Sequence, residues 1–233
     1  MSDLGDRLLD LLYPPKCAFC GKLVRGRRMI CPDCEAGLPT LAPELQRQDI
    51  SHLAVCVSPL YYTGVVRHSL HRYKFGGAAA YYRVYAELMA GCLHTQALQV
   101  DLVTWVPLSR KRLRKRGYDQ ARLLAEGVAR LTGLPCEPTL EKTRNNPAQS
   151  GTSSAEERQK NVQGVYRTVT SFAGEHILLV DDIVTTGATL SEAAGMLLDA
   201  GADEVFGLTL ARTVRNPGNI RTDSNGESKY ADF

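Results

Sequence analysis

Two adjacent carboxylates and three threonines lie close together in the segment from Asp181 to Thr189. The apolar run before them, 177–180, predicts a buried strand, and apolar residues at helical spacing follow in 190–198. A strand end, a small polar loop and a helix N-terminus direct backbone N–H groups and the positive end of the helix dipole to one point, where a phosphate can bind. Carboxylates repel a phosphate, so the acidic pair suits the hydroxyls of a sugar or a hydrated Mg²⁺ beside it.

The fourteen residues 177–190 resemble the loop that binds phosphoribosyl pyrophosphate (PRPP) in type I phosphoribosyltransferases. The shared order is an apolar strand, two acidic residues and a phosphate loop of small residues. The resemblance implies that the acidic pair faces the ribose hydroxyls of PRPP, that residues 185–189 surround its 5′-phosphate, and that Mg²⁺ accompanies the ligand. The alternative is an acidic pair at a strand end of an unrelated doubly wound protein. The expected PRPP-binding residues are Asp181, Asp182, Val184, Thr185, Thr186, Gly187, Ala188 and Thr189.

Four of the seven cysteines form two C-x-x-C pairs with ten residues between them. Four thiolates can close a tetrahedron around Zn²⁺, and a closed site leaves no position for catalysis, so the metal is expected to be structural. Iron, or a redox-active pair, is the alternative. Loss of the metal is expected to unfold residues 15–38 and to spare the rest of the chain. The expected ligands are Cys17, Cys20, Cys31 and Cys34.

Six basic residues in seven lie in the run 110–116, between a strand expected at 102–106 and a helix expected at 121–131. Ligands of open α/β sheets bind at the carboxyl ends of the strands, so a basic loop at this place suits pyrophosphate. A mobile, solvated loop and a contact to the backbone of nucleic acid are the alternatives. A phosphate role is also open for Arg72 and Lys74. The residues expected to bind pyrophosphate or nucleic acid are Ser109, Arg110, Lys111, Arg112, Arg114, Lys115 and Arg116.

The order of a Pro-Leu pair, a basic run and Arg116–Gln120 resembles the ComF family, as does the opening Tyr13–Cys20 with its cysteine module. The resemblance covers about residues 8–213. The usual family residues are Asn at Asp119 and Phe at Tyr118, so an Asn donor is missing here and weaker anion binding is expected nearby. The family that this order resembles includes a late-competence protein needed for DNA uptake in natural transformation.

The resemblance implies a PRPP-binding, phosphoribosyltransferase-like protein that acts in DNA uptake. Single-stranded DNA and other competence proteins are then further candidate partners. The second reading is an active, Mg²⁺-dependent phosphoribosyltransferase with an unidentified small-molecule acceptor. Stacking on bases is conceivable for aromatic residues that include Tyr13, Phe19, Tyr118, Tyr81 and Tyr82, although each can serve in packing instead.

Residues 141–161 contain few apolar side chains and are expected to form an exposed, mobile segment. By the same resemblance this segment is a hood that closes over PRPP and excludes water. A plain surface loop is the alternative. The hood residues expected to contact the ligand are Arg144, Gln149, Arg158 and Asn161.

The 233 residues, 44% of them hydrophobic, suit one α/β domain with a small extra module. The expected fold is a type I phosphoribosyltransferase-like, mostly parallel sheet flanked by helices, preceded by a zinc ribbon. The expected divisions are 1–45 for a short helix (3–12) and the cysteine module, 46–213 for the larger domain, and 214–233 for a flexible tail. The remaining expected elements are a linker at 35–50, strands at 53–57, 177–180 and 204–210, and helices at 65–75 and 82–93.

The net charge of +3 says little about partners. A membrane span is not expected, because the chain lacks an apolar run of about 18 residues. Acidic residues interrupt the Leu-rich N-terminal segment, which differs from the layout of a signal peptide. An odd number of cysteines with metal-ligand spacing fits reduced thiols. We therefore expect a cytoplasmic protein.

Overall fold

A computed structural model of the chain describes residues 15–24, 28–143 and 164–213. Three of the expected segments lie outside these residues, namely the helix at 3–12, the four hood residues and the tail. No helix among the described residues is both long enough and apolar enough to cross a membrane.

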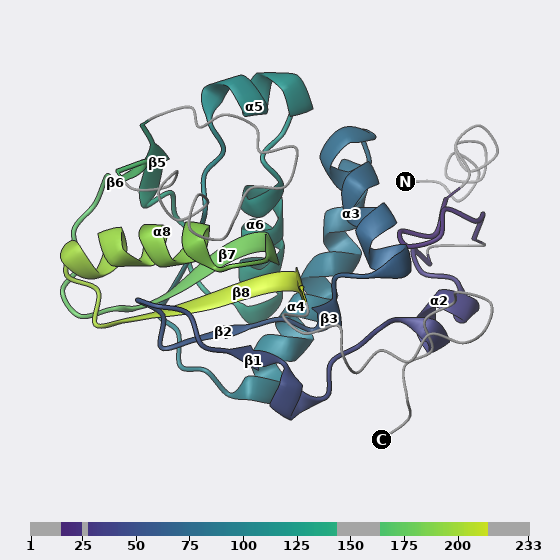
Figure 1. Cartoon of the computed structure of the whole chain (residues 1–233), viewed down its shortest axis with the longest axis horizontal. Helices are drawn as coiled ribbons and strands as arrows, with labels where there is room; N and C mark the ends of the chain where they lie inside the picture. Colours follow the sequence, from purple (N-terminus) through teal and green to yellow (C-terminus); the bar gives the residue numbers. More distant parts are fainter. Residues whose placement is uncertain (1–14, 25–27, 144–163, 214–233) are drawn as a thin grey trace.

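Six strands form one mostly parallel sheet (Figure 1). Their order is β1 (Arg47–Gln48), β2 (Val55–Val57), β8 (Glu204–Arg212), β7 (His176–Val184) and β4 (Leu102–Trp105), with β3 (Leu60–Tyr61) also paired to β8. All pairs are parallel except β1 with β2. The strands expected from their apolar runs are therefore present, and the predicted α/β class with a mostly parallel sheet is confirmed.

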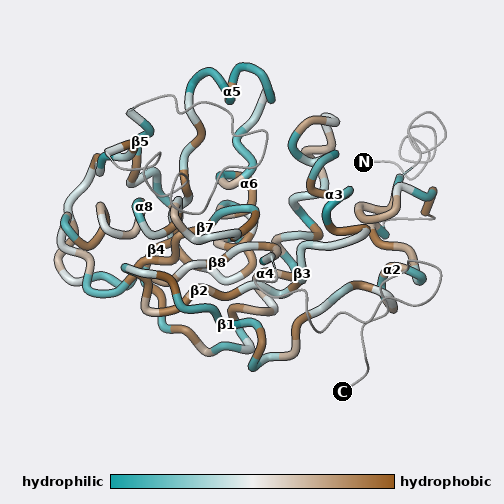
Figure 2. Tube along the Cα trace, viewed as in Figure 1, coloured by the Kyte–Doolittle hydropathy of each residue, from teal (hydrophilic) through white to brown (hydrophobic). Residues whose placement is uncertain are grey.

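Helices cover both faces of this sheet, because alternate residues of β7 point to opposite sides. Leu178 and Val180 lie in a hydrophobic cluster with residues of α3 (Gly64–Phe75), α4 (Tyr82–Gln96) and α6 (Gln120–Thr132). Ile177 and Leu179 lie in a second cluster with α8 (Ala188–Asp199). All four side chains are fully buried. In Figure 2 the hydrophobic colour is correspondingly concentrated in the interior.

The basic run is a helix, α5 (Arg110–Arg116), and the prediction of a loop was wrong. The hydroxyl of Ser109 caps its first turn, and Gly117 ends it at a φ of +80°. Arginine and lysine are good helix formers, and three of these cations lie in the last turn, where the negative end of the helix dipole offsets their repulsion. The hydrophilic α5 projects beyond the sheet in Figure 2.

Short elements complete the described part of the chain. The segment expected as a linker contains the end of α2 (Pro32–Gly37), the 3₁₀ turn η1 (Pro43–Leu45) and β1, so that interpretation was wrong for these residues. A second 3₁₀ turn, η2 (Ala79–Tyr81), precedes α4. The strands β5 (Leu140–Lys142) and β6 (Tyr166–Thr168) form a separate antiparallel pair.

The cysteine module packs into the core of the larger domain. Cys17, Ala18 and Phe19 are fully buried and belong to the same hydrophobic cluster as residues of α3 and α4. The ring of Phe19 lies 5.8 Å from that of Tyr85 on α4. In Figure 1 the module lies beyond α3, at the side of the sheet.

Candidate functional site

A pocket of about 240 Å³ opens where β4 and β7 end. These two strands are neighbours in the sheet, but the chain leaves β4 for α6 on one face and leaves β7 for α8 on the other. Such a divergence opens a crevice at the carboxyl ends of the strands. The pocket is lined by residues of α3, α5, β5, β6 and β7 as well as by the segment after β4.

Asp181 and Asp182 lie within the strand β7, which extends to Val184, and not after it. This corrects the predicted strand, which ended at residue 180. The strand β8 continues to Arg212 and pairs with β7 as far as Val184, whereas β4 ends at Trp105, opposite Val180. Beyond Val180, β7 therefore has a strand partner on one side and the pocket on the other. Asp181 and Asp182 both line the pocket.

An ion pair holds Asp182 in place. Lys74 Nζ, at the end of α3, lies 2.8 Å from Asp182 Oδ1, and the two side chains are only 21% and 9% exposed. Burial and the neighbouring Asp182 charge raise the pKa of Asp181 to about 7, and Lys74 partly opposes this rise. The pocket thus holds two carboxylates that a cation or a ligand hydroxyl can engage. Of the two α3 cations with a conceivable phosphate role, only Lys74 lines it.

The loop after β7 forms a small polar hollow at the N-terminus of α8. All eight residues expected to bind PRPP line this hollow or the adjoining pocket. Gly187 has a φ of +81°, and a Cβ there would lie 2.9 Å from the side chain of Ile50, so both its conformation and its surroundings favour glycine. The hydroxyl of Thr186 accepts a hydrogen bond from Ala188 N at 3.4 Å. Backbone N–H groups at a helix N-terminus suit a phosphate.

The helix α5 divides the basic run into two faces. Arg112 and Arg116, four residues apart and partly buried, line the pocket. Arg116 donates to Gln120 Oε1 at 2.7 Å, and its guanidinium lies 5.0 Å from the ring centroid of Phe75. The other cations of the run, Arg110, Lys111, Arg114 and Lys115, are exposed and do not line the pocket, and Ser109 is the buried cap of the helix.

Asp119 acts as a hydrogen-bond acceptor at both of its oxygens. Its carboxylate accepts from Leu108 N at 3.0 Å and from Arg122 N at 3.3 Å, so it caps α6 and holds the segment that follows β4. Burial raises its pKa, and these backbone donors partly oppose the rise. In both contacts the side chain of Asp119 is the acceptor, so a carboxylate can form them as well as the amide of an Asn can.

Lys142 is a pocket residue that sequence reasoning missed. It lies on β5, and its Nζ donates to the hydroxyl of Tyr166 at 3.2 Å and lies 5.0 Å from the ring centroid. Burial and the charge of Arg112 lower the pKa of Lys142 to about 8. Within 28–143 and 164–213, neither Lys142 nor Arg112 has a carboxylate ion-pair partner. Two neighbouring cations that form no ion pair with a carboxylate of the described residues favour a bound anion.

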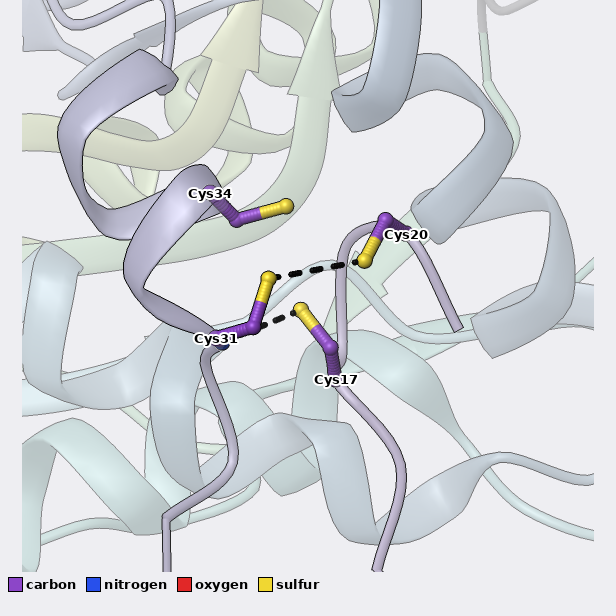
Figure 3. A group of neighbouring side chains, drawn as sticks. All are labelled: Cys17, Cys20, Cys31 and Cys34. Atoms are coloured by element: carbon purple, nitrogen blue, oxygen red, sulfur yellow. Dashed lines mark hydrogen bonds between the residues drawn. The ribbon is translucent and has the colours of Figure 1, made fainter. Parts of the chain in front are cut away.

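The four cysteines of the module converge on one point (Figure 3). Their sulfur atoms all lie within 4.8 Å of one another, and Cys20 Sγ and Cys31 Sγ are 3.6 Å apart. A tetrahedron with Zn–S bonds of about 2.3 Å has S–S edges of about 3.8 Å, so the thiols fit a zinc ion. Cys31 N also donates to Cys17 Sγ at 3.4 Å. Cys17 and Cys20 come from the first loop, whereas Cys31 and Cys34 lie at the start of α2.

Comparison with known proteins finds two matching domains. A double zinc ribbon domain matches residues 8–45, and a phosphoribosyl transferase domain matches residues 119–225. The DNA utilization protein YhgH of Salmonella typhimurium is 32% identical over 210 residues, which cover 85% of this chain and 90% of that protein.

Two further relatives carry competence names. The competence protein ComFC of Bacillus subtilis is 31% identical over 201 residues, covering 84% of this chain and 78% of that protein. Competence protein F of Haemophilus influenzae is 27% identical over 206 residues, with 85% of each chain covered. Because a phosphoribosyltransferase-type α/β domain follows a zinc ribbon here, and because these relatives match along most of their length, the chain belongs to the ComF family.

Proposed function

We propose that the pocket at the ends of β4 and β7 binds PRPP together with Mg²⁺. The observation that carries the proposal is the meeting of three complementary features in one crevice. These are a polar hollow at the N-terminus of α8, two carboxylates on β7, and cations from three different elements. A sugar with phosphates at both ends needs all three kinds of group.

Each part of the ligand has a matching group of residues. The 5′-phosphate suits the loop 185–189 and the first N–H groups of α8. The ribose hydroxyls suit Asp181 and Asp182 as acceptors. The pyrophosphate suits Arg112, Arg116 and Lys142, which line the same pocket. A bound Mg²⁺ would neutralise part of the pyrophosphate charge beside the carboxylates.

A transferase reaction is compatible with this arrangement. The bond from ribose C1 to the pyrophosphate oxygen would break, and the electron pair would leave with pyrophosphate while an acceptor nucleophile attacks C1. The protein would contribute positioning of the ribose and stabilisation of the departing negative charge by fixed cations. Since the acceptor is unidentified, we place PRPP binding first and transfer second.

Isothermal titration of the protein with PRPP and Mg²⁺ tests the proposal. Saturable binding of one PRPP per chain is expected. A protein that takes up no PRPP at millimolar ligand would rule it out. Incubation with radiolabelled PRPP and candidate acceptors then separates a binding protein from a transferase, because only a transferase releases pyrophosphate in step with product formation.

The pH dependence of PRPP binding should depend on Lys142. Because its pKa is about 8, the free protein loses this charge as the pH rises through 8, while a bound anion favours the protonated form. Affinity should therefore fall about tenfold between pH 7 and pH 9, and binding at pH 8 should take up about half a proton. Asp181, with a pKa of about 7, is ionised over most of this range, and Tyr166 remains neutral because burial raises its pKa.

Calorimetry in buffers of different ionisation enthalpy measures this proton uptake. Lys142→Ala should weaken binding about tenfold or more at pH 7, because a hydrogen bond to a charged group is worth roughly 1.5–3 kcal/mol. Lys142→Arg keeps a permanent charge, so it should bind PRPP with much less change between pH 7 and pH 9. An unchanged pH profile in both variants would remove Lys142 from the site.

The four exposed cations of α5 favour a second function, contact with single-stranded DNA. These residues, the outer cations, are Arg110, Lys111, Arg114 and Lys115. The relatives are named for DNA utilization and competence, and we propose a cytoplasmic role in DNA uptake, with other competence proteins as partners. Four exposed cations on one short helix suit a phosphate backbone. Phe19, one of the aromatic residues expected to stack on bases, is fully buried and cannot contact a base. Phe75, which the sequence analysis did not name, is 55% exposed beside Arg116 and can.

Salt titration of a fluorescent single-stranded oligonucleotide tests the DNA contact. If the outer cations bind phosphates, affinity should fall steeply with salt, and Arg114→Ala with Lys115→Ala should reduce the slope of log K against log salt by about 1.4. The matched pair Arg112→Ala and Arg116→Ala lies on the pocket face and should affect PRPP binding more than DNA binding. A wild-type slope near zero would leave α5 to pyrophosphate alone.

A further inference from the structure

The last turn of α3 contacts the cysteine module and the acidic pair through residues two positions apart. Arg72 Nη2 donates to the backbone oxygens of Ala18 at 3.0 Å and Phe19 at 2.7 Å. Two residues further on, Lys74 Nζ lies 2.8 Å from Asp182 Oδ1 in the pocket. One helical turn therefore connects two sites that the sequence separates widely.

The module side of this connection is tightly constrained. Ala18 and Phe19 lie between two of the expected metal ligands, so their carbonyl groups belong to the loop whose thiols converge. The carbonyl of Ala18 also accepts a hydrogen bond from the buried hydroxyl of Ser69, one turn earlier on α3. Because the loop is fully buried and bonded at these points, a change in its conformation must displace α3 or break the bonds to it.

The pocket side is constrained as well. Tyr73, between the two cations, is fully buried, and its hydroxyl donates to Gln120 O at 2.9 Å, at the start of α6. The hydroxyl of Tyr118 donates to Tyr73 O. These bonds fix the end of α3 against the segment that joins α5 to α6. The position of Lys74, and with it the orientation of the Asp182 carboxylate, thus depends on how α3 packs against the cysteine module and the segment between α5 and α6.

We propose that Arg72 is a positioning residue that couples metal binding by the four-cysteine module to PRPP binding in the pocket. Metal binding fixes the conformation of the loop whose carbonyl groups Arg72 contacts. That loop fixes the position of α3, and α3 in turn places Lys74 beside Asp182. Coupling of this kind is reciprocal, so PRPP must also strengthen metal retention. The PRPP half of the proposal rests on the proposed function. The contacts of Arg72 stand without it.

The equilibrium affinity for zinc, determined by competition with a chromogenic chelator, measures the coupling. Saturating PRPP with Mg²⁺ should raise the zinc affinity of the wild type by at least about fivefold, the lower end of typical coupling between sites. Arg72→Ala should bind zinc more weakly without ligand and should show no gain in zinc affinity from PRPP. Arg67→Ala is the matched control, because Arg67 is an exposed arginine of the same helix. Arg72→Lys, which keeps one cationic donor, should restore part of the effect.

Two results of this competition experiment would overturn the coupling. One is wild-type protein that binds PRPP by calorimetry but has the same zinc affinity with and without it. The other is an Arg72→Ala protein in which PRPP raises the zinc affinity as strongly as in Arg67→Ala. Wild-type protein that does not bind PRPP at all contradicts the proposed function instead.

Hydrogen exchange tests, in the absence of PRPP, whether the loss of Arg72 affects the pocket. In zinc-loaded Arg72→Ala, amides of residues 73–76 and 181–184 should exchange faster than in zinc-loaded Arg67→Ala. Equal exchange of both segments in the two variants would show that the contacts of Arg72 do not influence the conformation of the pocket.

Discussion

Replacing Asp181 and Asp182 together by Asn should reduce PRPP affinity by at least about a hundredfold while leaving the fold intact. Each carboxylate that loses its charge forfeits a charge-assisted hydrogen bond to a ribose hydroxyl, worth roughly 1.5–3 kcal/mol. Two such losses correspond to a factor of about 10² or more. The fold should tolerate the change because both side chains line the pocket and Asn keeps their shape. Isothermal titration with PRPP and Mg²⁺ measures the effect.

The single variants should differ, because among the described residues Asp182, unlike Asp181, forms an ion pair with a cation. Asp182→Asn leaves Lys74 partly buried with a weaker partner, so this variant should lose more affinity than Asp181→Asn and some stability as well. Asp199→Asn is the control, since this exposed aspartate lies at the opposite end of α8 from the phosphate loop. If the double variant binds PRPP as tightly as the control, the acidic pair does not bind the ligand.

Removal of the metal should destabilise the whole domain and not only the module. Zinc analysis of the pure protein should give about one ion per chain, and replacing all four cysteines by Ser should abolish it. The sequence led us to expect that only residues 15–38 would unfold, but residues of this segment pack into the core of the larger domain. Phe19 is fully buried against α3 and α4, and removing a buried aromatic side chain from a core costs about 3–5 kcal/mol.

Thermal unfolding measures this prediction. A loss of that size should lower the melting temperature by on the order of 10 °C for a domain of this size. Cys136→Ser is the matched control, because this half-buried cysteine lies outside the module, so it should retain zinc and melt near the wild type. Stoichiometric metal in the quadruple variant would contradict the ligand assignment. Metal loss with an unchanged melting temperature would contradict the structural role.

Motifs that are contiguous in the chain could be predicted from the sequence. The strand, acidic pair, phosphate loop and helix of 176–199 are adjacent residues, so their order alone indicates an anion site at a strand end. The two C-x-x-C pairs are equally local, and their spacing alone predicts a four-thiolate site. The long strands and helices were also predicted, because their apolar periodicity extends over enough residues to be recognised. The hood residues fall outside the described part of the chain and stay a prediction.

The short strands, and the face of α5 on which each basic residue lies, could not be predicted from the sequence. Strands of two or three residues, such as β1, β3 and β5, are too short to show an alternating pattern and exist because a neighbouring strand pairs with them. The basic run was interpreted as a loop because it lies between a strand end and a helix. The cap at Ser109, the left-handed Gly117 and the helix propensity of arginine and lysine favour a helix instead, and only a helix separates Arg112 and Arg116 from the exposed cations.

The composition of the pocket was decided by tertiary structure. Lys74 comes from α3, Lys142 from β5 and Asp182 from β7, segments that are far apart in the chain and meet at one pocket in the folded structure. The sequence determined that an acidic pair and a phosphate loop would follow a buried apolar run. It could not determine which cations would face them, because side chains from distant segments are brought together by the packing of helices on the sheet and not by any local pattern.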